Sequence, residues 1–193
     1  QNLGTGETRD VTVTYKVTDT GSPSMDSEHV SFTITVTGTN DAPTATFSDP
    51  QTATEGAAQI SGNLTAEDID GSDTTFTFVY VQGRYTNAET GQARDISGFT
   101  IATDGSWTFD PTHADYDSLA KDESLTLTVD YKAMDDENLA STTQNFTIQL
   151  TGTNDAPDVT AYPNPPAVAE GAAQISGDLN DTASDKDNGD SLT

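Results

Sequence analysis

The sequence contains no cysteine and very few basic residues. Only 7 Lys and Arg stand against 32 Asp and Glu, which gives a formal net charge of −25. Without cysteine, disulfides cannot stabilise the fold. The shortage of basic side chains argues against binding to nucleic acid or to an anionic membrane surface, since both need positive patches. The charge balance favours either cation binding or solubility in a salty medium.

Long apolar runs and helical periodicity are also absent. No apolar run approaches the ~18 residues of a membrane span, and no signal peptide is visible, so direct membrane insertion is not expected. The chain begins at Gln1 rather than at a methionine, and we expect it to be an excerpt of a longer protein. Apolar residues alternate with polar ones in short runs, which favours folded strands over disorder.

Two sequence blocks recur at nearly constant spacing. GTNDAP occupies 38–43 and 152–157, and EGAAQISG occupies 55–62 and 170–177. Small changes in spacing are expected if insertions lie in loops between fixed strands. We therefore predict the last part of a first repeat (1–42), one complete cadherin-like repeat (43–156) and the start of a third repeat (157–193).

The alternation pattern predicts an all-β fold. Apolar and polar residues alternate along 11–17 and again along 125–131, and Asp-Gly at 104–105 is a typical hairpin turn. About seven short strands per repeat indicate an antiparallel β-sandwich of immunoglobulin-like type, in tandem repeats. The expected strands are A (44–54), B (57–64), C (74–82), D (96–102), E (105–110), F (124–133) and G (142–151).

Acidic residues gather where two repeats meet. In such a sandwich the B–C and F–G loops lie at the end where strand A enters, and the A–B turn and E–F loop lie at the other end. The first junction, around the linker residues Asn40 and Asp41, should bring together Asp68, Asp70, Asp73 and Asp135. The second junction, around Asn154 and Asp155, should bring together Glu55, Asp115, Asp117, Asp185, Asp187 and Asp190.

These two groups have the chemistry of a calcium site. Ca²⁺ takes ~6–8 oxygen ligands, whereas zinc and copper favour Cys and His, of which the chain has only His29 and His113. Two carboxylates ~4 Å apart repel by about 4 kcal/mol at an effective dielectric constant of ~20, so a shared cation is favoured. Asp, Asn and Gly are also ordinary turn residues. Any one of these acids could be a turn residue, but their repetition at both junctions favours Ca²⁺.

Several motifs resemble a known repeat family. GTNDAP after a strand, DGSWTF (104–109) and LTLTVDYKAMD (125–135) are similar to the VCBS repeat of giant bacterial surface proteins, which is itself cadherin-like. The cadherin motifs correspond in chain order to Glu55, Asp68-x-Asp70, Asp115-Tyr116-Asp117, Ala133-Met134-Asp135 and Asn154-Asp155. Segment 17–23 is close to the cadherin Ala-x-Asp-x-Gly-x-Pro pattern. Asp117 stands where cadherins have Glu, and the linker has fewer acids, which leaves the number of ions per junction open.

The resemblance implies a role as well as a fold. Such repeats are extender modules of large RTX-type adhesins, which are exported by type I secretion and fold outside the cell in the presence of calcium. They serve attachment and biofilm formation at the bacterial cell surface. The implied partners are neighbouring repeats of the same chain. Neither partial end repeat can build a full core alone, so we expect these pieces either to be poorly ordered or to complement one another between neighbouring molecules.

Two other readings of the sequence are weighed against this one. Glu55, Asp115 and Asp117 could imitate the carboxylate pair of a glycosidase, but they belong to the repeat pattern beside the linkers, so no enzymatic activity is expected. A carbohydrate-binding module of a secreted protein is the main alternative. It would need exposed aromatic residues outside the core, for which the candidates are Tyr80, Tyr85 and Tyr162. Trp107, in the predicted hairpin, is expected to be a core residue.

Overall fold

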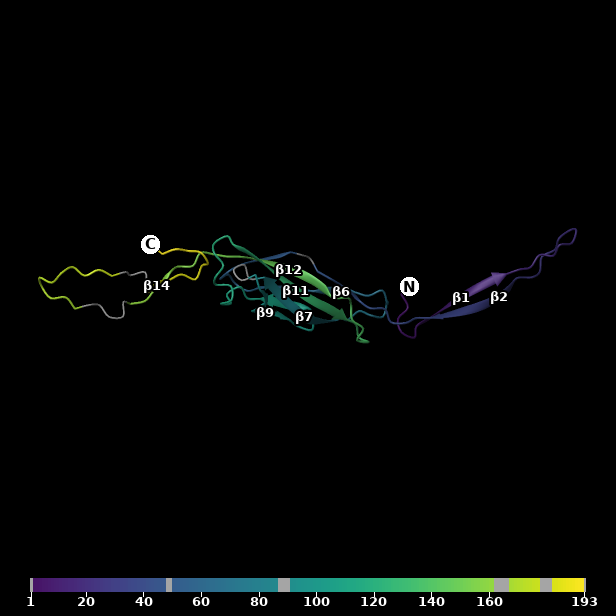
Figure 1. Cartoon of the computed structure of the whole chain (residues 1–193). Coiled ribbons are helices and arrows are strands. Elements are labelled where there is room, and N and C mark those ends of the chain that lie inside the picture. The colour runs from purple at the N-terminus through teal and green to yellow at the C-terminus, as the bar shows by residue number, and fades with distance from the viewer. Residues whose placement is uncertain (1, 48–49, 87–90, 162–166, 178–181, 193) are drawn as a thin grey trace.

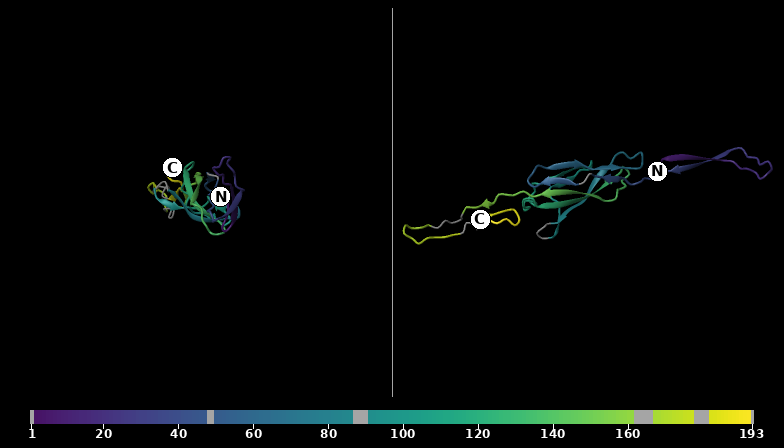
Figure 2. Two further views of the ribbon diagram at one scale, coloured as in Figure 1. Left: turned by 90° about the vertical axis from the view of Figure 1, so that its right-hand side faces the viewer. Right: turned by 90° about the horizontal axis from the view of Figure 1, so that it is seen from above.

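The computed structural model describes residues 2–47, 50–86, 91–161, 167–177 and 182–192. The described residues form strands and the loops between them, and no helix among them is long and apolar enough to cross a membrane. The molecule is elongated, with one sandwich in the middle, a strand hairpin at one end and the C-terminal segment at the other (Figures 1 and 2).

The central sandwich has two layers. The first sheet has the order β4-β12-β11-β7-β8, in which β4 runs parallel to β12 and the other pairs are antiparallel. The second layer contains the sheet β5-β10-β9 and the pair β3-β6. The bounds are β3 Thr44–Thr46, β4 Gln51–Thr54, β5 Ile60–Asn63, β6 Thr65–Glu67, β7 Thr77–Thr86, β8 Ala93–Asp95, β9 Phe99–Ile101, β10 Ser106–Phe109, β11 Ser124–Met134 and β12 Gln144–Thr151. The immunoglobulin-like β-sandwich predicted from the sequence is therefore confirmed.

Two predicted strands are wrong in detail. The expected strand 44–54 is divided between the layers, because β3 pairs with β6 whereas β4 pairs with β12. Pro50 directly precedes β4 and has no N–H to continue a ladder. The expected strand 96–102 is interrupted at Gly98, whose φ of 69° requires glycine. The segment before it forms the additional strand β8, which pairs with a longer β7.

The two layers enclose one aromatic core. The core-facing residues of β11 and β12 alternate with more exposed ones, and Phe146 is fully buried. Trp107 is 1% exposed, which confirms its predicted place in the core. Its ring centroid lies 5.3 Å from that of Phe146 and 6.0 Å from those of Phe47 and Phe99. On the facing strand, a Cβ at Gly62 would come within 2.7 Å of the indole, so glycine makes room for it.

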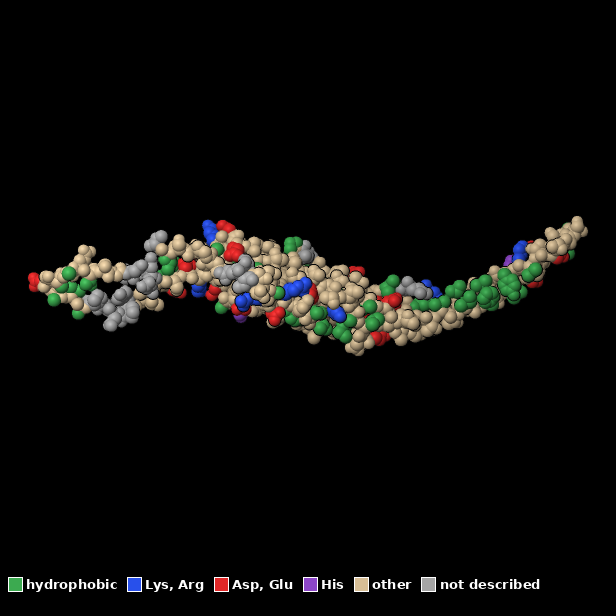
Figure 3. Space-filling view, viewed as in Figure 1, with side chains coloured by type: hydrophobic (Ala, Val, Ile, Leu, Met, Phe, Trp, Pro, Cys, Tyr) green, Lys and Arg blue, Asp and Glu red, His purple; other side chains and the backbone are tan. Residues whose placement is uncertain are grey.

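The two ends of the chain lie outside the central sandwich. The antiparallel pair β1 (Thr8–Tyr15) and β2 (Val30–Thr37) corresponds in sequence to β11 and β12. At the C-terminal end, β13 (Asp158–Val159) pairs with β14 (Ala183–Ser184). The core residues of the described chain all lie between 45 and 150. The apolar residues Tyr15, Phe32 and Ile34 are therefore about half exposed, and a row of apolar side chains runs along the hairpin (Figure 3).

Candidate functional site

The first glycine of each GTNDAP block lies so close to another segment of the backbone that a side chain would not fit. The Gly38 N–H donates a 2.8 Å hydrogen bond to the carbonyl of Glu7, and Gly152 makes the same 2.8 Å bond to Glu123. A Cβ on Gly38 would lie 2.3 Å from the carbonyl oxygen of Leu3, and one on Gly152 would lie 2.3 Å from that of Ala120. Each linker is thus held against the segment that precedes β1 or β11, the first strand of the pair that leads into the linker. This contact sets the direction in which Asn-Asp leaves that strand pair.

At the first junction, two loops of the central sandwich hold the linker. Asp68 directly follows β6, and Asp135 directly follows β11. The Asp41 N–H donates to Asp70 Oδ2 at 2.7 Å, and Asn40 Nδ2 donates to Asp135 Oδ2 at 2.8 Å. The Asp70 N–H in turn donates to Asp68 Oδ1 at 2.9 Å, which turns the Asp70 carboxylate toward the linker.

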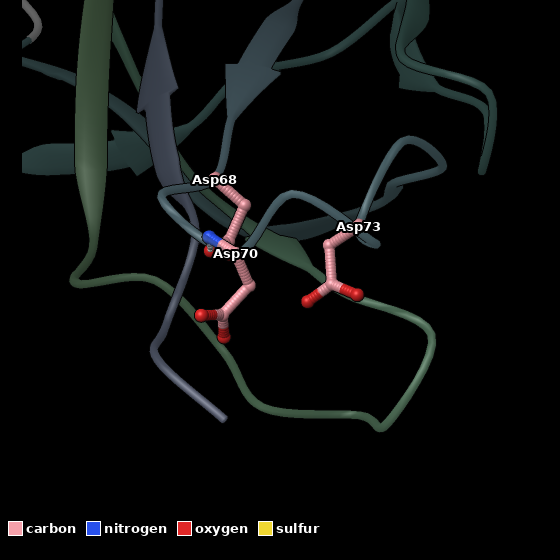
Figure 4. Close-up of side chains that lie close together, drawn as sticks. All are labelled: Asp68, Asp70 and Asp73. Carbon is pink, nitrogen blue, oxygen red and sulfur yellow. Dashed lines mark hydrogen bonds between the residues drawn. The ribbon is translucent and has the colours of Figure 1, made fainter. Parts of the chain in front are cut away.

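The acids of this loop converge rather than point into water. Carboxylate oxygens of Asp68, Asp70 and Asp73, one from each, lie within 4.8 Å of one another. Figure 4 shows the carboxylates of Asp70 and Asp73 turned to the same side of the loop. The structure therefore brings together the side chains of five residues predicted for the first junction, namely Asn40, Asp68, Asp70, Asp73 and Asp135. Of the sixth, the exposed Asp41, it brings the backbone N–H to the group.

Several oxygens of this group are buried and have no partner. Asp70 is 1% exposed and Asp135 is 3% exposed. The buried atoms without a hydrogen-bond partner at this junction are Asn40 Oδ1, Asp68 Oδ2, Asp70 Oδ1 and Asp73 Oδ2. A buried carboxylate oxygen without a partner is costly unless a cation compensates it. The donor set consists of hard oxygens and fits Ca²⁺.

The second junction repeats this geometry. The Asp155 N–H donates to Asp187 Oδ2 at 2.9 Å, and the Asp187 N–H donates to Asp185 Oδ1 at 2.9 Å. Carboxylate oxygens of Asp185, Asp187 and Asp190, one from each, lie within 4.8 Å of one another. These contacts match those of Asp41, Asp70 and Asp68 at the first junction.

Glu55 adds a carboxylate from the preceding sandwich. Its Oε2 accepts a 2.9 Å hydrogen bond from the Thr153 N–H, whereas its Oε1 and Asp187 Oδ1 are buried without a partner. Burial raises the pKa of Glu55, and the charges of Asp155, Asp117 and Asp187 raise it further. Acids from both sides of the linker therefore act on one another at this junction.

The predicted triplet at 115–117 is divided by its central tyrosine. Tyr116 is fully buried, and its hydroxyl donates to the Ser97 carbonyl at 2.9 Å and accepts from the Ser97 N–H at 3.1 Å. Asp117 lies on the junction side, where Lys186 Nζ is 3.2 Å from its carboxylate. Asp115 instead accepts a hydrogen bond from the Ser97 hydroxyl, so the structure does not bring it to the junction group.

The structure differs from the prediction at two further residues, Asn154 and Glu137. Asn154 is exposed, and its side-chain Nδ2 donates to the carbonyl of Asp155 at 2.8 Å rather than to an acid of the next repeat. Glu137 was missed by the sequence reading, although it lies close to Asp73 and Asp135. The signal was present as the acidic run 135–137, but the cadherin-like pattern ends at its first residue.

The raised pKa of Glu55 gives a pH prediction for the calcium-free protein. The pKa of Glu55 in the folded state is higher than its ordinary value of 4.5. Protonated Glu55 therefore stabilises the folded state, and this stabilisation is complete at pH values below 4.5. It is lost as the pH rises through the folded pKa. Glu55→Gln has no titrating group at this position, so its free energy of unfolding should decrease less than that of the parent as the pH rises. Denaturant unfolding at pH 4 to 7 with chelator would measure it, with the exposed Glu67→Gln as the matched control. Equal pH slopes for Glu55→Gln and the parent would contradict the prediction.

The described residues offer few exposed aromatic side chains and no large pocket for binding a carbohydrate. Tyr80 is 41% exposed, whereas Tyr85 is 5% exposed, and Tyr162 lies outside the described residues. A hollow lined by Arg84, Tyr85, Thr86, Ala93, Thr126 and Thr128 has a volume of about 190 Å³. Ligand pockets usually measure ~300–1,000 Å³. The hollow is thus smaller than an ordinary ligand site.

Comparison with known proteins places the chain in a family. Solved structures with limited similarity include fibronectin(III)-like modules of CbhA from Clostridium thermocellum, at 12% identity and a TM-score of 0.33, covering 78% of this chain and 88% of that one. A mutant of the SrpA adhesin from Streptococcus sanguinis shows 15% identity and a TM-score of 0.32, covering 62% of this chain and 65% of that one. No curated protein matches. Residues 40–149, more than half of the sequence, match the bacterial Ig domain family, and the chain therefore belongs to that family.

Proposed function

We propose that the chain is a calcium-stabilised extender module of a large bacterial surface adhesin, of the VCBS-repeat type. The observation that carries this proposal is the set of buried, unpartnered oxygens at both linkers. Bacterial Ig domains are a family in which such a role is reasonable, and the resemblance of GTNDAP and its neighbouring motifs to VCBS repeats supplies the more specific function.

The ion would connect consecutive repeats. At the first junction, Asn40 and Asp41 of the linker would share it with Asp68, Asp70, Asp73 and Asp135. At the second, Glu55 and Asp117 precede the linker, whereas Asp185, Asp187 and Asp190 follow it. Ca²⁺ supplies positive charge that offsets the repulsion between these acids. At the second junction the ligands come from both sides of the linker, so binding there would restrict bending between repeats. At the first junction the ion would fix the linker to the sandwich that follows it.

The location and the partners of the module follow from the same proposal. It would act outside the cell, at the bacterial surface, within a longer chain whose neighbouring repeats are its first partners. It would support attachment and biofilm formation by extending the adhesive part away from the cell. Complementation between the end pieces of neighbouring molecules stays a prediction, which concentration-dependent association in analytical ultracentrifugation would test.

Calcium should therefore change both the stability and the shape of the purified chain. At ~100 times the dissociation constant, one site contributes about 2.7 kcal/mol to the free energy of unfolding. We expect a higher melting temperature in calcium than in chelator. X-ray solution scattering should also show a narrower distribution of long interatomic distances, because the junctions bend less.

The control is the same pair of measurements in magnesium at equal ionic strength. Mg²⁺ requires a smaller, near-octahedral ligand shell and keeps several waters, so it should have the weaker effect. An unchanged melting temperature together with an unchanged scattering profile in calcium would disprove the proposal.

A further inference from the structure

The loop between β11 and β12 carries an acid that the linker does not use. Glu137 lies two residues after Asp135, and carboxylate oxygens of Asp73, Asp135 and Glu137, one from each, lie within 4.8 Å of one another. Asp73 belongs to the loop between β6 and β7. This group therefore joins two loops of one sandwich and contains no residue of the linker or of a neighbouring repeat.

The carboxylate of Asp73 is buried and incompletely hydrogen-bonded. The residue is 8% exposed, and its buried Oδ2 has no hydrogen-bond partner. Its Oδ1 receives only a long, 3.3 Å hydrogen bond from the Ser72 hydroxyl. In Figure 4 the carboxylate lies between Asp70 and the loop that follows β11. Glu137 is exposed, so the group opens to solvent on one side, where an ion and its remaining waters can enter.

No basic side chain compensates these acids in the part of the chain that the structure describes. The ion pairs found there join other acids, namely Asp26, Asp130, Asp115 and Asp117. The carboxylates therefore repel one another as long as nothing positive lies between them.

We propose that Asp73, Asp135 and Glu137 bind a second divalent cation, which ties two loops of one repeat together. Asp73 is shared with the Asp68 and Asp70 group, so it would bridge the second ion to the ion of the first junction. The inference rests on the proposed function in taking the same ion and in sharing Asp73 and Asp135 with the first junction, whereas Glu137 belongs to this group alone. The corresponding loop of the first repeat has Gly21 where Glu137 stands, so the second ion is a property of the individual repeat rather than of every junction.

The test is the number of calcium ions bound by the full chain. Glu137→Gln should lower the stoichiometry in isothermal titration calorimetry by one ion per chain. It should preserve the calcium-dependent change in solution scattering, because the linker ligands are intact. Asp136→Asn removes the same charge from the neighbouring exposed residue and should keep the parent stoichiometry. Asp70→Asn should instead abolish the change at the first junction.

The outcomes separate this inference from the proposed function. A parent chain that binds no calcium overturns both. Calcium binding with the same stoichiometry in Glu137→Gln and the parent overturns the second site alone. Loss of the scattering change in Glu137→Gln would place Glu137 in the junction itself, and would also overturn a separate ion held within one repeat.

Discussion

Trp107→Ala should lower the free energy of unfolding by about 3–5 kcal/mol, the usual cost of removing a large buried aromatic side chain. The indole is 1% exposed and packs against Phe47, Phe99 and Phe146. These rings are fixed by the strands of both layers, so they can fill only part of the cavity that the alanine variant would leave. Urea unfolding in calcium would measure the loss as a lower midpoint with an unchanged slope.

Trp107→Phe keeps the measurement informative if the alanine variant does not fold. The indole Nε1 is buried without a hydrogen-bond partner, and phenylalanine removes this unsatisfied donor. Alanine removes the same donor, but phenylalanine keeps an aromatic ring in the core and leaves a smaller cavity, so its loss should be smaller than that of alanine. Tyr80→Ala, at a 41% exposed position, is the control for aromatic removal near the surface. A loss below about 1 kcal/mol for Trp107→Ala would contradict the core assignment and would revive the carbohydrate-binding alternative.

Asp70→Asn should have opposite effects with and without calcium. In calcium, loss of the first-junction ion should lower the free energy of unfolding by about 2.7 kcal/mol at ~100 times the dissociation constant. In chelator, the variant should be at least as stable as the parent, because one of several neighbouring negative charges is gone. Asparagine keeps an oxygen that can accept the hydrogen bond from the Asp41 N–H. Thermal unfolding in the two buffers measures both effects.

The second junction provides a matched repeat of this experiment. Asp187 accepts the hydrogen bond from the Asp155 N–H, just as Asp70 accepts the one from the Asp41 N–H, so Asp187→Asn is the equivalent change. The junctions lie at opposite ends of the sandwich (Figure 1), so the two losses should add. The exposed Asp136→Asn serves as the charge control. A loss of similar size in chelator and in calcium would mean that Asp70 stabilises the loop directly, without a cation.

Strand order allowed much of the first junction to be predicted. Once the loops of an immunoglobulin-like sandwich were assigned to its two ends, Asp68, Asp70 and Asp135 had to meet the linker, and the structure places them there. Asp115 could not be placed in this way. Its direction depends on the buried Tyr116 between it and Asp117, and on a hydrogen bond from Ser97, a residue 18 positions away.

Glu137 shows a different limit of the sequence. It lies just beyond the cadherin-like pattern, which ends at Asp135, so it was not among the predicted ligands. Its closeness to Asp73 results from two loops that are more than 60 residues apart in the chain and lie at the same end of the sandwich. Only the tertiary structure brings these carboxylates together.

The sequence by itself determined the all-β class, the repeat spacing and the acidic chemistry of the linkers, because alternation, recurrence and charge are local properties of the chain. The tertiary structure decided which oxygens are buried without a partner. It also decided that the strand expected at 44–54 divides between two sheets, and that the glycine of each GTNDAP lies against a backbone carbonyl. These features depend on contacts between distant segments, which no local pattern encodes.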